Sequence, residues 1–270
     1  MSNKILVLVI HGIGSQTEIF AESCIKRLSN KITRLGKNYQ DVVWLPLYWA
    51  QFTEVAQLEY FKAAKASADL DYLSLRKFVL TALGDASAYQ KTMSGENRTY
   101  DNIHAFIDTE ISRVVNDSTS GIGPESPVIL LAHSLGGHIM SNYIWDKQQA
   151  PDAAKSALEN MQTLCGIMTF GCNIPLFTFA YTPITPIQFP PTTLSPDLLT
   201  KAKWLNFYDS DDVLGYPLKC INAQYDSVVD QDIAINVGSI LTSWNPACHT
   251  AYWTDNDFIS PVAKYISSFI

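Results

Sequence analysis

Two stretches of this chain are apolar at every position, and this continuity restricts the possible folds more than any other feature. They are ILVLVI at residues 5–10 and VILLA at residues 128–132. A strand with one face in water alternates apolar and polar residues, whereas a strand of a parallel sheet covered on both faces is apolar throughout. The two stretches therefore predict central strands of a parallel sheet that lies between two layers.

Segments of helical periodicity lie between the predicted strands. Apolar residues recur every three or four positions from Phe20 to Leu35 and again from Tyr100 to Val114. Both patterns are typical of helices with one buried face. The alternation predicts an α/β fold in which residues 1–270 form a single domain. Further strands are expected at residues 42–49, 164–170, 204–208 and 233–237, and further helices at 139–144 and 259–269.

Two segments interrupt this alternation. Residues 51–99 predict a helical insertion, in which Tyr72 to Leu83 is apolar on more than one face. We expect that helix to be buried against the sheet, and contact with a lipid surface is the alternative. Residues 174–196 hold six of the 13 prolines and no charged residue, so a helix is not expected there.

The sharpest chemical signal is the sequence AHSLGG at residues 132–137, between a predicted strand and a predicted helix. Small residues two positions before and two after Ser134 permit the tight strand-to-helix turn of a nucleophile elbow. Such a turn places a serine hydroxyl at the N-terminus of the next helix, whose dipole favours developing negative charge. Ser134 is therefore the candidate nucleophile, and tight packing or an anion site is the alternative.

A glycine-containing turn, HGIG at residues 11–14, follows the first strand. Backbone N–H groups exposed by such a turn can stabilise the oxyanion of acyl transfer together with the N–H that follows the nucleophile. We therefore expect Ile13 and Leu135 to form the oxyanion hole. A nucleotide-binding turn is the rival interpretation, but the third glycine and the downstream acidic residue of that motif are missing.

A serine nucleophile needs a base, and the chain has five histidines. His133 and His138 flank the elbow and can point away from Ser134, while His104 falls on the polar face of a predicted helix. In a triad of the order serine, acid, histidine, the base comes last. The order favours His249, which lies in a loop beyond the last strand.

The acid is expected after the strand at 204–208, where the sequence DSDD offers three carboxylates. Its task is to accept the second imidazole proton and stabilise the imidazolium. We favour Asp211, from the spacing D-x-V-L-G, with Asp212 second and Asp209 third. A Mg²⁺ or Ca²⁺ site built from these aspartates is the rival, but no second acidic cluster supports it. We therefore predict no metal site.

Charge, cysteine content and the N-terminal apolar run indicate the partners and the compartment of the protein. The net charge is −7, with 19 basic residues scattered along the chain, so there is no electrostatic footprint for nucleic acid. The five widely spaced cysteines are typical of reduced thiols rather than a disulfide framework. The apolar run at 5–10 is too short for a secretory signal, so we expect a cytoplasmic protein.

Four motifs, LVLVIHGIG, VILLAHSLGG, NFYDSDDVLG and CHTAYW, occur in the order of the α/β-hydrolase superfamily, which this chain resembles in its lipase and esterase branch. The turn at Thr169 to Pro175 is also similar. The resemblance implies a mostly parallel sheet with helices on both faces and no cofactor. It also implies a lid or acyl-pocket wall at 174–196, where Phe177 and Phe179 would contact the substrate.

The expected function is hydrolysis of small-molecule or lipid carboxylic esters through Ser134, Asp211 and His249. Thioesterase, amidase or acyltransferase chemistry on the same residues remains open, because a triad does not fix the acceptor or the leaving group. A non-catalytic binding module is the alternative from another class. Contact with a membrane surface is not expected, and Tyr72 to Leu83 is the segment that would make it.

Overall fold

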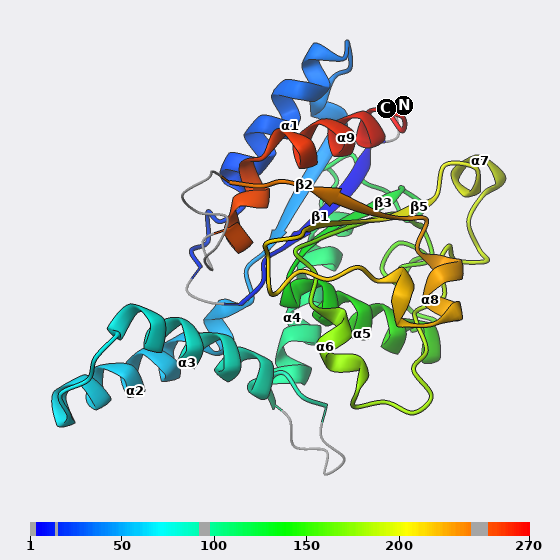
Figure 1. The fold of residues 1–270 in the computed structure, drawn as a ribbon. Coiled ribbons are helices and arrows are strands. Elements are labelled where there is room, and N and C mark those ends of the chain that lie inside the picture. Colours follow the sequence, from blue (N-terminus) through cyan, green and yellow to red (C-terminus); the bar gives the residue numbers. More distant parts are fainter. Residues whose placement is uncertain (1–3, 14–15, 92–97, 239–247) are drawn as a thin grey trace.

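The computed structural model describes residues 4–13, 16–91, 98–238 and 248–270. Its centre is a sheet of six parallel strands in the order β2-β1-β3-β4-β5-β6 (Figure 1). The six strands confirm the predicted α/β fold, with ends within three residues of the expected ones. They are β1 (Ile5–Ile10), β2 (Val42–Leu47), β3 (Val128–His133), β4 (Leu164–Phe170), β5 (Lys203–Asp209) and β6 (Gln231–Ile235).

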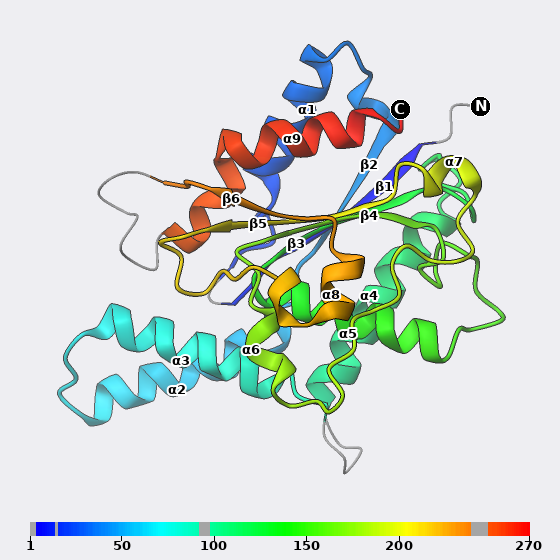
Figure 2. The ribbon, with the colours of Figure 1, turned by 45° about the vertical axis from the view of Figure 1, so that its right-hand side comes forward.

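Helices cover both faces of the sheet (Figure 2). One face carries α1 (Glu22–Arg34) and α9 (Asn256–Ser267), and the other carries α4 (Arg98–Asn116) and α5 (Leu135–Gln149). Successive residues of a strand point to opposite faces. In β1, the odd-numbered residues pack with α1 and α9, and the even-numbered residues pack with α4 and α5. This explains why the strand is apolar throughout.

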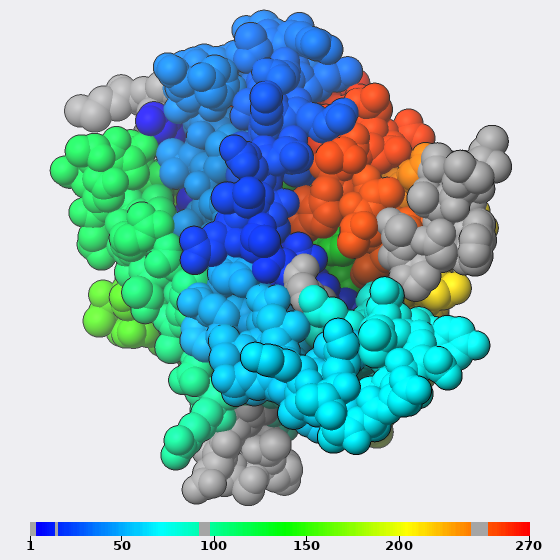
Figure 3. Space-filling model, turned by 90° about the vertical axis from the view of Figure 1, so that its left-hand side faces the viewer, coloured from blue at the N-terminus to red at the C-terminus, as the bar shows by residue number. Residues whose placement is uncertain are grey.

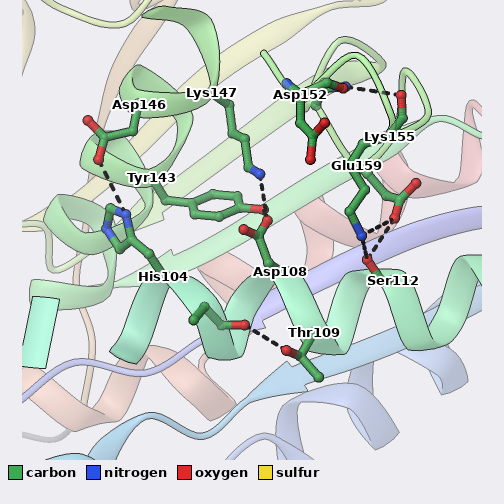
Figure 4. Close-up of polar contacts among 12 residues, drawn as sticks. His104, Asp108, Thr109, Ser112, Tyr143, Asp146, Lys147, Asp152, Lys155 and Glu159 are labelled. Atoms are coloured by element: carbon green, nitrogen blue, oxygen red, sulfur yellow. Dashed lines mark hydrogen bonds and ion pairs between the residues drawn. The ribbon is translucent and has the colours of Figure 1, made fainter. Parts of the chain in front are cut away.

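Charged and polar side chains join α4 to α5 beyond the core (Figure 4). Tyr143 and Lys147 of α5 point toward Asp108 of α4, with an O–H···O distance of 2.7 Å and an ion pair of 2.7 Å. His104 lies 3.4 Å from Asp146, and its side chain is 13% exposed. His104 lies on the polar face of α4, as the sequence predicts, and α5 and neighbouring tyrosine rings cover most of it.

The insertion at 51–99 is helical, as expected, but it is not buried against the sheet. It forms a hairpin of α2 (Glu54–Ser67) and α3 (Leu73–Ala88) that projects from the body (Figures 1 and 2) and faces the viewer, in cyan, in Figure 3. In α3 only Thr81 and Asp85 are buried, while Leu75 is 55% and Leu83 is 67% exposed. The prediction that the sheet buries this helix is wrong, because the hairpin packs its two helices on each other.

The proline-rich segment contacts α5 at two places, where Phe177 stacks on His138 and where Gln188 exchanges hydrogen bonds with Gln148. It contains one five-residue helix, α6 (Ile174–Thr178), where no helix was expected, with Pro175 in its first turn. Proline is tolerated there because the first helical N–H groups have no partner within the helix. The other short helices are α7 (Pro196–Leu199) and α8 (Ala223–Val228), with 3₁₀ turns at 39–41, 50–52, 219–221 and 248–254.

The strand order has a switch point between β1 and β3. From β1 the chain moves to β2 on one side and then returns to β3 on the other side. Ligands of open α/β sheets bind outside the carboxyl ends of the strands at such a switch point. Here the segments that follow β1 and β3 are Gly12–Ile13 and Ser134. The fold therefore brings two of the motifs together.

In the part of the chain that the structure describes, no helix has the length and apolar character needed to cross a bilayer.

Candidate active site

Ser134 occupies a sharp turn between β3 and α5. Its backbone has φ 52° and ψ −126°, a combination that is strained for a residue with a side chain. The turn brings helix and loop backbones close together. A Cβ at Gly136 would stand only 2.6 Å from the carbonyl oxygen of His11, so a larger residue does not fit there. The small residues of AHSLGG thus serve the packing that the sequence suggested.

Close contact with Ser134 explains why position 12 of the HGIG turn is a glycine. A Cβ on this residue would lie 2.4 Å from Cβ and 2.9 Å from Oγ of Ser134. Only glycine permits that approach, so the loop after β1 lies directly beside the Ser134 hydroxyl. The N–H groups of Ile13 and Leu135 make no hydrogen bond with any described residue.

His11 holds this loop in place. Its Nε2 accepts the Trp49 backbone N–H at 3.1 Å, and the Trp49 indole N–H donates to the His11 carbonyl at 2.9 Å. The two rings stack at 5.0 Å. Burial lowers the pKa of His11 to about 4, against a smaller opposing effect of its bond to Gly12, so the ring is neutral at pH 7. No sequence pattern predicts that His11 and Trp49 pair.

His249 lies against Ser134 although 115 positions separate them. Its Nε2 is 2.7 Å from Oγ of Ser134, at the length of a hydrogen bond in which the serine hydroxyl donates. The ring belongs to η4 (Cys248–Thr254) and is buried. The structure therefore brings together the predicted nucleophile and the predicted base.

The acid facing His249 is Asp212, not Asp211. The Nδ1–H of His249 donates to Asp212, with distances of 2.8 Å to Oδ2 and 3.0 Å to Oδ1. Asp211 is exposed, and its side chain makes no contact with His249. The preference for Asp211 is wrong, and the second-ranked Asp212 takes its place.

The turn after β5 decides between these neighbours. Asp209 is buried, and its carboxylate accepts the N–H groups of Asp211 at 2.8 Å and Val237 at 2.6 Å. The Asp212 N–H then bonds to the Asp209 carbonyl at 3.2 Å, which closes a turn. Asp209 thus fixes the turn that points Asp212 inward and Asp211 outward. The conformation of this turn decides which aspartate faces His249, and residue spacing alone does not determine that conformation.

Asp212 is ionised in this environment. Burial opposes its charge, but hydrogen bonds from His249, Leu214 and Tyr252 outweigh burial and lower the pKa of the carboxyl below its ordinary value. The Tyr252 hydroxyl donates to Oδ2 at 3.0 Å and accepts the Asp209 N–H at 2.8 Å. Gly215 makes room for the carboxylate, since a Cβ there would lie 2.6 Å from Oδ2. The sequence does not predict that Tyr252 contacts the acid.

The two predicted substrate-binding residues occupy different surroundings. Phe177 stacks on His138, with ring centroids 4.1 Å apart, and lines a cavity of about 410 Å³ between α5 and residues 174–185. Ser134 and His249 do not line this cavity. Phe179 is 82% exposed on the surface. The structure therefore places neither phenylalanine against Ser134.

The three aspartates after β5 do not converge on one point. Asp209 binds backbone N–H groups, Asp212 binds His249 and Asp211 faces solvent. Within residues 4–13, 16–91, 98–238 and 248–270, no group of three histidine, cysteine, aspartate or glutamate side chains is arranged to hold a metal ion.

No protein-family model matches this chain, and no curated protein sequence matches it. The interpretation of the site therefore rests on its geometry.

Proposed function

We propose that this protein is a serine hydrolase of the α/β-hydrolase fold that cleaves carboxylic esters through an acyl-enzyme intermediate. The observation that carries the proposal is the continuous chain of hydrogen bonds from Ser134 Oγ through His249 to Asp212. A hydroxyl, an imidazole and a buried carboxylate in this order are the parts of a serine triad, which is recognised by geometry rather than by sequence position.

Each residue has one task in this proposal. His249 removes the Ser134 proton as Oγ attacks the ester carbonyl, and then gives that proton to the leaving alkoxide. Asp212 keeps Nδ1 of His249 protonated and stabilises the imidazolium. In deacylation, His249 takes a proton from water, hydroxide attacks the acyl carbonyl, and the proton returns to Ser134.

The amides of Ile13 and Leu135 supply the electrostatic part of catalysis. Both N–H groups lack a partner among the described residues, and Leu135 begins α5, so the helix dipole adds to its effect. Donors that are fixed before the reaction stabilise the tetrahedral oxyanion without reorganisation, and losing one costs about 10²- to 10³-fold in rate. These amides support acyl transfer over a purely structural role for the elbow.

Labelling with a fluorophosphonate tests the proposal, because the reagent phosphonylates only an activated serine. We expect one adduct on Ser134 by peptide mapping, none in Ser134→Ala, and much slower labelling in His249→Ala. Ser126→Ala is the matched control, since Ser126 is also buried but caps the Gly123 N–H. Folded wild-type protein without an adduct would contradict the proposal. A panel of esters, thioesters and amides then identifies the leaving group.

A further inference from the structure

His133 is a buried histidine that the proposed reaction does not use. It ends β3 and directly precedes Ser134, and its side chain is fully enclosed. Its ring lies 4.7 Å from that of His249 and 5.3 Å from that of Trp253, measured between centroids. The residue thus lies between the nucleophile strand and the segment that carries the base.

Among the residues that the structure describes, the ring makes one hydrogen bond, to the main chain of His249. Nε2 of His133 is 2.6 Å from the carbonyl oxygen of His249. A carbonyl oxygen only accepts, so Nε2 carries the hydrogen. The other nitrogen, Nδ1, is buried without a partner among the described residues and lies 3.1 Å from where a Cβ on Gly12 would stand. His133 therefore spans the space between the Gly12 loop and His249.

The protonation state of His133 is fixed. Burial and, next, the neighbouring His249 lower its pKa well below the ordinary value, whereas its hydrogen bond to His249 and the nearby Asp212 oppose this shift. The remaining titratable neighbour, His11, is also neutral at pH 7. His133 thus stays a neutral donor and does not compete for the Ser134 proton.

We propose that His133 is a positioning residue, which donates its Nε2–H to the backbone carbonyl of His249 and so fixes that imidazole against Ser134. This inference rests on the proposed function. The Ser134–His249 bond breaks and re-forms in each turnover as the proton moves to the leaving group. The His133 proton does not move, so its bond anchors the base through both half-reactions.

Replacing the donor tests the inference. His133→Met keeps the length and burial of the side chain but removes the N–H, and His133→Gln restores an N–H at similar reach. We expect kcat of His133→Met to fall about 10- to 100-fold with KM nearly unchanged, because small displacements of a catalytic group have effects of this size. His133→Gln should recover most of the loss. His104→Met, a histidine largely covered in the α4–α5 contact, is the matched control and should retain wild-type kcat.

A spectroscopic signature separates positioning from a general structural effect. A displaced His249 pairs less well with Asp212, so the far-downfield proton resonance between these two residues should shift or broaden in His133→Met. Loss of stability alone does not move this resonance. If His133→Met does not fold, His133→Asn, whose amide is too short to reach the carbonyl, replaces it.

The two proposals fail in different ways. Wild-type protein that takes no fluorophosphonate contradicts the proposed function, and the downfield resonance still reports on positioning without turnover. Wild-type labelling together with unchanged kcat and an unchanged resonance in folded His133→Met overturns the role of His133. A loss that His133→Gln does not recover also overturns it, because the hydrogen bond is then not the cause.

Discussion

The edge of the sheet that holds the candidate site consists of polar side chains, and the α2–α3 hairpin carries many apolar ones, yet the structure buries the polar side chains and exposes the apolar ones. At the edge, Ser134, His249 and Asp212 are each at most 4% exposed and bound to one another. In the hairpin, Leu75 and Val79 are 55% and 43% exposed. Apolar content therefore predicts burial only where the topology supplies a second surface.

Polar contacts differ in the same way. The site connects residues that are far apart in sequence, such as His133 with His249 and Ser134 with His249. At the base of the hairpin, buried Asp85 of α3 accepts hydrogen bonds from Thr53 and Gln57, each at 2.7 Å, which are at most 32 positions away. A shape made of local contacts can project from the body, whereas a site made of distant contacts exists only when the whole sheet is formed.

The largest expected effect is on the acid. Asp212→Asn should lower kcat by about 10⁴-fold, because an amide in place of the carboxylate favours the wrong tautomer of His249 and does not stabilise the imidazolium. Asp211→Asn, its matched neighbour, should stay within about twofold, as expected for an exposed side chain. Ester hydrolysis under saturating substrate measures both. A larger loss in Asp211→Asn would restore Asp211 as the acid.

Acidification should destabilise the fold through its buried histidines. The folded-state pKa values of His11 and His104 lie at about 4, mainly because burial disfavours their charged forms. The unfolded chain binds these protons from about pH 6.5 downward, so the free energy of unfolding falls as pH decreases below that value. Each histidine contributes up to about 1.4 kcal/mol per pH unit. Chemical denaturation from pH 7.5 to 5 measures the slope above the range of most carboxyls.

The histidine-free hairpin gives the control for that slope. In His104→Gln, the slope of the free energy of unfolding against pH should decrease by the equivalent of about one proton. Substitutions in the hairpin should leave this slope unchanged. Equal slopes in wild type and His104→Gln would show that His104 is not the source.

The smallest expected effect is in the hairpin itself. Leu75→Ala should change the free energy of unfolding by less than about 0.5 kcal/mol, because the side chain is largely in water. Ile107→Ala in α4, where the residue is 0% exposed, should cost about 2–5 kcal/mol. Denaturant titration of both variants compares the two regions directly. A large cost for Leu75→Ala would mean that another surface covers the hairpin in solution.

Local sequence determined the elements and the chemical groups. Contacts within a strand or a tight turn determine three of the patterns, which are therefore visible in the sequence. They are the apolar strands β1 and β3, the small residues around Ser134 and the glycine at position 12. The expected strands and the pairing of Ser134 with His249 follow from these patterns and from motif order.

Only the tertiary structure decided the rest, because those features depend on distant parts of the chain. The choice of Asp212 over Asp211 follows from the turn that Asp209 fixes through Val237, and the contact of His133 with His249 joins residues 116 positions apart. The helix α3 is exposed because it packs on α2 and not on the sheet. Periodicity tells which side of a helix is apolar, but it contains no information on which surface will cover it.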